Sequence, residues 1–109
     1  MKVKEFAEKL GLKPLTGCGE EKEIRGVYVG DLLSVVMGNC REGDAWITVQ
    51  THPNILTVAD LNDAACIVIA GRAAAEQSLI DKAEDAGVSL LETELSVYDL
   101  AWRTHEVLK

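Results

Sequence analysis

Residues 65–80, ACIVIAGRAAAEQSLI, decide the fold expected for this chain. An apolar run rich in β-branched residues ends at Gly71, and an alanine-rich run that favours a helix begins directly after it. The pattern predicts a buried strand over 64–70 and a helix over 73–86 that ends at Gly87. A change from strand to helix of this kind is typical of plain α/β proteins, and it also occurs beside bound phosphate groups.

The same alternation continues on both sides of this stretch. The further strands and extended segments that we expect are 12–16, 24–29, 45–50 and 88–93. The further helices that we expect are 3–10, 32–37, 53–62 and 96–108. Asp31 is expected to cap the second of these helices, and Thr51 or His52 the third. Apolar strands between helices predict an α/β fold of three layers, a mostly parallel sheet flanked by helices, and the length suits a single domain, 1–109.

Composition and charge exclude several classes of protein. The content of 48% apolar and 27% charged residues is ordinary for a globular domain. The net charge is −7 without any cluster of Lys or Arg, so we expect no binding to nucleic acid. No apolar run approaches the roughly 20 residues that cross a bilayer, and the N-terminus lacks the apolar core of a signal peptide. We therefore expect a cytoplasmic protein that does not associate with membranes.

No group of residues has the spacing of a metal site or a catalytic site. The three cysteines are far apart, and His52 and His105 lie at no metal-ligand spacing from them. Cys66 is expected in the core, and Cys18 and Cys40 in exposed turns. Phosphoryl transfer needs a glycine-rich loop with a lysine, and the chain contains no Gly-Lys-Ser or Gly-Lys-Thr. We predict no catalytic residue, no metal and no cofactor.

The carboxyl ends of the parallel strands are expected at one edge of the sheet, where open α/β sheets usually bind ligands. The candidate ligand-binding residues at this edge are Gly71, Arg72, Ala73, Thr51, His52 and Thr93. A helix that begins at Ala73 would offer free amides and the positive end of its dipole to an anion, and Arg72 would add a charge. In the alternative interpretation, Gly71 only makes the turn, Thr51 caps a helix and Arg72 faces solvent. The sequence leaves both interpretations open.

The last predicted helix carries two lines of apolar and aromatic residues. The line expected to face the sheet consists of Val97, Leu100, Ala101, Thr104 and Leu108. The second line, which points elsewhere, consists of Tyr98, Trp102 and His105. Because aromatic residues are favoured in interfaces, we predict that this second line, together with Trp46, forms an interface with another subunit or with a partner. In the alternative, both lines are partly buried within one chain and Trp46 belongs to the core.

Several short motifs occur in the order that is found in DRTGG domains. They are GDLLS (30–34), ITVQ (47–50), the apolar strand with its glycine turn, and GVSLLET (87–93). The chain therefore resembles the DRTGG domain family, which is similar in fold to the N-terminal domain of HPr kinase/phosphorylase. Where the family commonly has a Thr-Gly-Gly turn, this chain has Ala70-Gly71-Arg72, and where an Asp-Arg pair is usual it has Gln50-Thr51-His52.

The resemblance implies a regulatory or assembly module that is frequently dimeric and has no established chemistry. Our first hypothesis is a non-catalytic regulatory or protein-interaction module that forms a homodimer. The second is a small-ligand sensor that binds a nucleotide or phosphate at the turn around Gly71. The third is an accessory domain related to the regulation of HPr serine kinase. A kinase activity of the chain itself is not expected, because the phosphate-binding loop is missing.

Overall fold

The computed structural model describes the whole chain, residues 1–109, and consists of five helices and five strands. In chain order they are α1 (Val3–Leu10), β1 (Lys13–Pro14), β2 (Gly26–Val29), α2 (Leu33–Asn39), β3 (Asp44–Thr48), α3 (Asn54–Leu61), β4 (Cys66–Ile69), α4 (Gln77–Ala86), β5 (Leu90–Glu92) and α5 (Val97–Leu108). Every element predicted from the sequence is present. None of the helices combines the length and the apolar character that a membrane span requires.

All five strands form one sheet, in the order β1-β5-β4-β3-β2. Strands β2 to β5 are parallel neighbours, and β1 pairs antiparallel with β5, with Lys13 opposite Glu92. Parallel neighbours need a crossover connection, and here α2, α3 and α4 make the three crossovers. The mostly parallel sheet predicted from the sequence is therefore confirmed. The carboxyl ends of β2 to β5 lie at one edge of this sheet.

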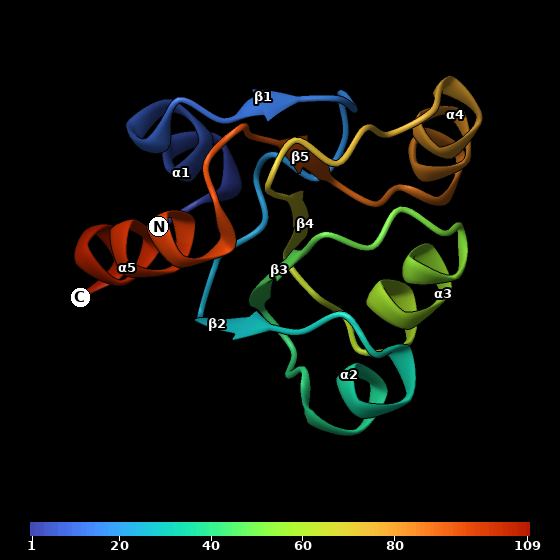
Figure 1. Cartoon of the computed structure of the whole chain (residues 1–109), viewed down its shortest axis with the longest axis horizontal. Coiled ribbons are helices and arrows are strands. Elements are labelled where there is room, and N and C mark those ends of the chain that lie inside the picture. Colours follow the sequence, from blue (N-terminus) through green and yellow to red (C-terminus); the bar gives the residue numbers. More distant parts are fainter.

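The helices cover the sheet in two groups, so that the fold has three layers (Figure 1). Helices α2, α3 and α4 lie on one side, and α1 and α5 lie on the other. The first group packs on Trp46 and Ile67, and the second packs on Ile47 and Val68. Neighbouring residues of one strand enter different clusters because successive side chains of a strand point to opposite faces. The three-layer architecture predicted from the sequence is confirmed.

Helix α4 begins four residues later than the sequence predicts. Its first residue is Gln77, and the alanine-rich segment before it is irregular. Gly71 and Arg72 both have a left-handed backbone, with φ of 69° and 64°, which is incompatible with a right-handed helix. The three alanines after this turn form no helix in spite of their high helix propensity.

Asp31 does not cap α2, whose N-cap residue is Leu32. The Asp31 carboxylate turns instead to the end of the neighbouring strand. Its Oδ1 accepts a hydrogen bond from the Thr48 hydroxyl at 2.7 Å and another from the Val49 N–H at 2.8 Å. The side chain therefore joins the carboxyl ends of β2 and β3, and the prediction of a helix cap is wrong.

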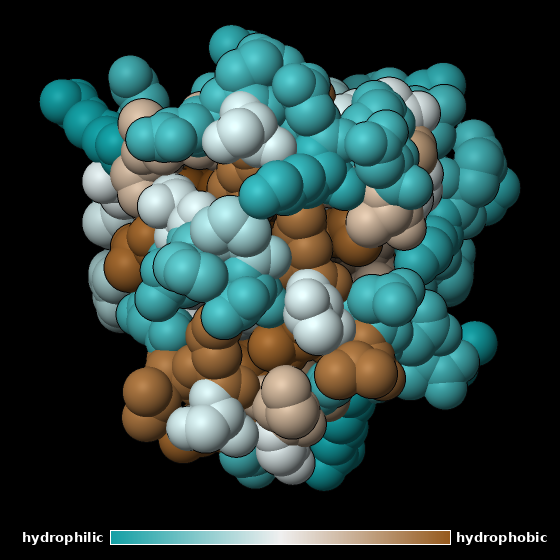
Figure 2. All heavy atoms as spheres, turned by 90° about the vertical axis from the view of Figure 1, so that its right-hand side faces the viewer, coloured by the Kyte–Doolittle hydropathy of each residue, from teal (hydrophilic) through white to brown (hydrophobic).

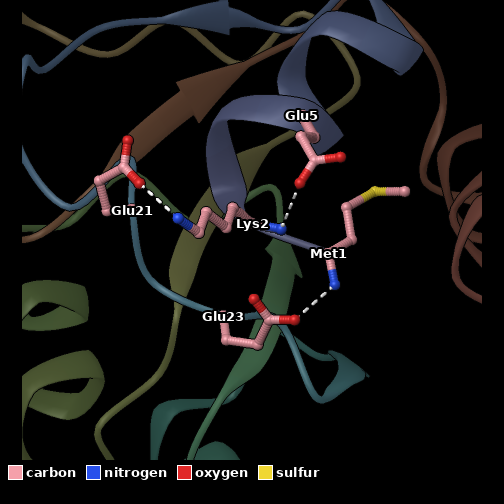
Figure 3. A network of polar contacts seen from close by, with 5 residues as sticks. All are labelled: Met1, Lys2, Glu5, Glu21 and Glu23. Atoms are coloured by element: carbon pink, nitrogen blue, oxygen red, sulfur yellow. Dashed lines mark hydrogen bonds and ion pairs between the residues drawn. The ribbon is translucent and has the colours of Figure 1, made fainter.

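Residues of the acidic loop before β2 form ion pairs with the first two residues of the chain (Figure 3). The Met1 amino group lies 2.8 Å from Glu23 Oε1, and the Lys2 ammonium lies 2.8 Å from Glu21 Oε2. The hydrogen bond and the charge of Glu21 raise the pKa of Lys2. Exposed pairs of this kind stabilise a fold little, whereas the backbone bond from Ile24 N–H to Met1 O, 2.8 Å, ties the N-terminus beside β2.

Gly26 begins β2 where a larger residue does not fit. A Cβ atom there would lie 2.6 Å from Oδ1 of Asp44, a buried carboxylate whose Oδ2 accepts the Arg41 N–H at 2.8 Å. We expect Gly26→Ala to lower the free energy of unfolding by about 1–3 kcal/mol, because this carboxylate has to move.

Gly38→Ala is the matched control for this substitution. Nothing lies within 4 Å of a Cβ atom at Gly38, which lies inside α2. Alanine is favoured over glycine in a helix by about 0.5–1 kcal/mol, so we expect this variant to be more stable than the parent. Urea denaturation measures both changes. Equal effects of the two substitutions would contradict the close approach of Gly26 to Asp44.

Candidate ligand-binding site

The chain leaves β4 and β5 toward opposite faces of the sheet. After β4 it runs to α4 on the face of the crossover helices, and after β5 it runs to α5 on the other face (Figure 1). Two neighbouring parallel strands that exit in this way leave a crevice between their carboxyl ends, and ligands of open α/β sheets usually bind there. This chain has a hollow of about 860 Å³ at that point.

Three parts of the chain line this hollow, which we call the β4–β5 crevice. They are the turn after β4, the segment from the end of β5 into α5, and the end of α1 with β1. The residues that they contribute are Arg72, Ala73 and Ala74; Glu92, Thr93, Glu94, Leu95, Ser96, Asp99 and Arg103; and Leu10, Gly11 and Lys13.

The β4–β5 crevice carries equal numbers of opposite charges. The three cations are Lys13, Arg72 and Arg103, and the three carboxylates are Glu92, Glu94 and Asp99. Among them, only Lys13 and Glu92 form an ion pair, with 3.7 Å between Nζ and Oε1. The crevice is therefore suited to a ligand that combines anionic groups with hydrogen-bond donors, and less to a simple anion.

A tight turn places Arg72 at the crevice. Gly71 and Arg72 occupy its two central positions with positive φ, as in a type I′ turn, and the Ala73 N–H donates to the Ala70 carbonyl at 3.4 Å. The Gly71 N–H donates to the Leu95 carbonyl at 2.7 Å, which joins the two sides of the crevice. A left-handed arginine costs about 1–2 kcal/mol relative to glycine. Strained residues of this kind are concentrated at functional sites.

Backbone groups add neutral donors to the crevice. The N–H groups of Arg72, Ala74 and Glu94 donate to no other group of the chain. The N-terminus of α5 also opens there, and its N-cap residue Ser96 accepts the Asp99 N–H through Oγ at 3.1 Å. Free amides and a helix N-terminus favour anionic groups. The anionic part of a ligand would therefore lie between the turn and α5.

The predicted anion site on the helix after Gly71 is wrong in one respect. The sequence suggests free helix amides at Ala73, whereas α4 begins at Gln77 and its N-cap residue is Glu76. Helix amides reach the crevice from α5 instead. Arg72 keeps its predicted place beside the turn, on the β4 side of the crevice.

The six predicted ligand-binding residues are divided between two places. Arg72, Ala73 and Thr93 line the β4–β5 crevice, and Gly71 makes its turn. The remaining two, Thr51 and His52, line a second hollow of about 320 Å³ after β3, which shares only one residue with the crevice. Nδ1 of the histidine accepts the N–H of Asn54, the first residue of α3, at 3.1 Å. The N-cap residue of α3 is Pro53 and no side chain caps the helix, so the prediction of Thr51 or His52 as its cap is wrong.

Sequence reasoning missed Lys13, Asp99 and Arg103. Lys13 reaches the crevice through the pairing of β1 with β5, which joins residues 13 and 92 and leaves no local signal in the sequence. Ser96, Asp99 and Arg103 follow one another at i, i+3 and i+7 along α5, so one polar line on this helix could have been read from the sequence.

The four predicted interface residues differ in exposure. Tyr98 is 76% exposed and Trp102 is 46% exposed, and His105 is exposed on the same line of α5. Trp46 is completely buried in the core, and its Nε1–H donates to the Gly30 carbonyl at 2.9 Å. The prediction that Trp46 belongs to an interface is therefore wrong. Its strand is covered on both faces by helices, which the sequence of the strand alone does not reveal.

The three free thiols are weak nucleophiles. Burial raises the pKa of Cys40 to about 11 and that of Cys66 to about 12. Burial and then the Glu84 side chain raise the pKa of Cys18. The prediction of an exposed Cys40 is wrong, because its side chain packs in the core beneath α2 and α3. No group of three His, Cys, Asp or Glu side chains is placed to hold a metal ion.

These raised pKa values predict slow thiol modification of the folded protein. The thiolate is the reactive form, and its fraction falls as the pKa rises. At pH 8 we expect Ellman's reagent to react with the native chain more slowly than with free cysteine, and to titrate all three thiols only after unfolding. Rapid reaction of a native thiol would contradict this assignment.

Among the comparisons with known proteins, one with a solved structure bears on the fold. No protein-family model matches the sequence, and no curated protein matches it. A solved structure with a TM-score of 0.75 contains the CBS and DRTGG domains of the regulatory region of Clostridium perfringens pyrophosphatase complexed with the activator diadenosine tetraphosphate. The similarity covers 94% of this chain but only 45% of that one, at 13% sequence identity. At this identity the likeness is one of fold, and it confirms a DRTGG-like α/β fold for this chain.

Proposed function

We propose that the chain is a non-catalytic regulatory module, a single domain over 1–109 that acts as a homodimer and binds a nucleotide in the β4–β5 crevice. The observation that carries the proposal is the position of this crevice, between two parallel strands that exit to opposite faces. The proposal joins the regulatory and the ligand-sensing hypotheses, because a regulatory module needs a signal to respond to.

The charges of the crevice favour a nucleotide over inorganic phosphate. Arg72, Arg103 and the free amides suit the phosphate groups of a ligand. The carboxylates of Glu92, Glu94 and Asp99 would repel a bare phosphate, but they accept hydrogen bonds from ribose hydroxyls and base amino groups. A nucleotide provides both kinds of group in one molecule.

The structural neighbour supports the same class of ligand. It is a regulatory region complexed with a nucleotide activator, diadenosine tetraphosphate. That region also contains CBS domains, and this chain corresponds to 45% of its length. The neighbour's ligand therefore does not by itself assign a nucleotide to this chain. The proposal of a nucleotide in the crevice rests first on the residues of the crevice.

The proposal assigns no phosphoryl transfer to the chain. The sequence contains no glycine-rich loop with Gly-Lys-Ser or Gly-Lys-Thr around which a kinase would hold its phosphates. Radiolabelled ATP incubated with the pure protein and HPr should leave HPr unlabelled, and labelled HPr would favour the kinase-related alternative. A cytoplasmic location suits the three unpaired thiols.

A thermal-shift titration tests the nucleotide proposal. AMP, ATP and diadenosine tetraphosphate are compared with adenosine and with inorganic phosphate at equal ionic strength. A ligand at 100 times its Kd stabilises a fold by about 2.7 kcal/mol, which gives a saturable rise in Tm. We expect this rise with at least one nucleotide and not with phosphate. No saturable shift with any nucleotide would contradict the proposal.

A further inference from the structure

The two edges of the sheet differ in how they are protected. The edge strand β1 has two residues, a lysine and a proline, and both discourage the addition of another strand. The opposite edge strand β2 reads GVYV, without proline and without charge. No other strand of the chain covers its outer side. The β2 edge is therefore open to pairing.

Exposed apolar side chains surround this open edge. Nine large apolar residues of the chain are exposed, and all but Val49 and Leu61 belong to β2, to the segment after it, to α2 or to α5. We call the five of β2, of the segment after it and of α2 the β2 patch: Val27, Val29, Leu32, Val35 and Met37. Figure 2 shows hydrophobic atoms gathered at the lower end of the molecule, where α2 lies in Figure 1.

The aromatic line of α5 lies on the same side of the molecule as β2. His105 and Ala101 line a hollow of about 520 Å³ together with Val27. Tyr98 and Trp102 continue the line of His105 toward the start of α5. Of the aromatic residues that the sequence assigns to an interface, His105 therefore lies beside the open edge, whereas Tyr98 lies near the start of α5, where Ser96 and Asp99 line the β4–β5 crevice.

The hydrogen-bonding groups of β2 alternate between the sheet and the open side. The Arg25 N–H donates to Gly43 O at 2.8 Å, toward β3, and the Ile24 N–H donates to Met1 O at 2.8 Å, on the outer side. The register from Gly26–Asp44 to Val29–Ile47 and the Gly30 N–H, which donates to Ile47 O at 3.2 Å, place the N–H and C=O groups of Tyr28 toward β3. Within β2, those of Val27 and Val29 therefore point to the open side. An added strand could pair with both residues.

We infer that a second copy of this chain pairs its β2 antiparallel with this β2, across a two-fold axis at Tyr28. In this register Val27 lies opposite Val29 of the second copy, and each of the two such pairs exchanges two backbone hydrogen bonds. The two five-stranded sheets join into one. This inference rests on the homodimer of the proposed function and names the surface that forms it.

Charge complementarity favours a second copy over another partner. An exposed arginine, Arg25, precedes the uncharged strand, and an exposed aspartate, Asp31, follows it. Antiparallel pairing brings the Arg25 guanidinium of each copy toward the Asp31 carboxylate of the other. Oδ1 of Asp31 is occupied by Thr48 and Val49, whereas Oδ2 accepts no hydrogen bond within the chain. Arg25 Nη1 lies 3.8 Å from Glu42 Oε1 in an exposed pair, and such a pair contributes little to stability. Two symmetric ion pairs between Arg25 and Asp31 can therefore form at the ends of the joined strands.

A single cysteine at the axis tests the register. Tyr28 would face its own copy in a non-hydrogen-bonded pair with Cα atoms about 4.5 Å apart, a distance that a disulfide spans. In a Cys18→Ala background, Tyr28→Cys is expected to form a disulfide-linked dimer on mild oxidation. Leu61→Cys in the same background, at a site 67% exposed on α3, is expected to remain unlinked.

Sedimentation with Val29→Lys completes the test. The parent is expected to sediment with the mass of two chains, and Val29→Lys with that of one, while Leu61→Lys behaves as the parent. A monomeric parent, or a dimeric parent whose Tyr28→Cys variant stays unlinked, would overturn the inference. Val29→Lys should keep its nucleotide-induced shift in Tm, because the crevice lies at the other side of the sheet. Sedimentation thus tests the dimer and the shift in Tm tests nucleotide binding, so failure of one proposal can be distinguished from failure of the other.

Discussion

Replacing Trp46 with alanine is expected to lower the free energy of unfolding by about 3–5 kcal/mol. Trp46 is completely buried between the sheet and the crossover helices, so alanine would leave a cavity lined by several side chains. The substitution also leaves the Gly30 carbonyl without the indole N–H that it binds at 2.9 Å. Total stabilities of small domains are about 5–15 kcal/mol, so much of the protein would unfold under mild denaturant.

Trp102→Ala is the control, since this tryptophan is 46% exposed. Under conditions in which the parent is monomeric, we expect a change within about 0.5 kcal/mol. Denaturation in urea, followed by circular dichroism, measures both variants. A loss below about 1 kcal/mol for Trp46→Ala would show that Trp46 is not a core residue, and would restore its predicted place in an interface.

The double substitution of Arg72 and Arg103 by alanine is expected to weaken nucleotide binding by a factor of about 100 or more. Hydrogen bonds to charged groups contribute about 1.5–3 kcal/mol each, and each 1.4 kcal/mol is a factor of ten in Kd. The two arginines line the crevice from the β4 turn and from α5, and neither is held by an ion pair within the chain. Calorimetric titration with the nucleotide that gives the largest shift in Tm measures the loss.

Two further variants separate binding from folding. Arg41→Ala removes an exposed arginine before β3, which does not line the crevice, and is expected to leave Kd unchanged. Arg72→Gly places glycine where φ is 64°, so the strain of the arginine is relieved and the fold gains about 1 kcal/mol while nucleotide affinity falls. Equal affinity of the double variant and the Arg41→Ala control would place the ligand elsewhere.

The layers of the fold could be predicted because burial leaves a plain pattern in the sequence. Strand β4 is apolar at every position and is buried on both faces. Gly11 and Gly87 end α1 and α4 with φ of 64° and 73°, as glycine after a helical pattern indicates. These signals are local, so the sequence alone contains them.

The site was predicted less completely because it depends on contacts between distant segments. The alanines after Gly71 favour a helix, but the chain makes a left-handed turn at Arg72 and stays irregular until α4 begins at Gln77. Lys13 meets the crevice only through a strand pair that joins distant ends of the chain. Exposure of single aromatic residues is also decided by tertiary packing, which separates Trp46 from Trp102.

The central claim is that the crevice between β4 and β5 binds a nucleotide, and NMR tests it most directly. ¹H–¹⁵N spectra of the labelled protein are recorded during titration with ATP or diadenosine tetraphosphate. We expect the largest saturable shifts in the amides of residues 72–74 and 92–96, with little change at the β2 edge. Saturable shifts confined to other parts of the chain, or spectra that do not change at millimolar nucleotide, would contradict the claim.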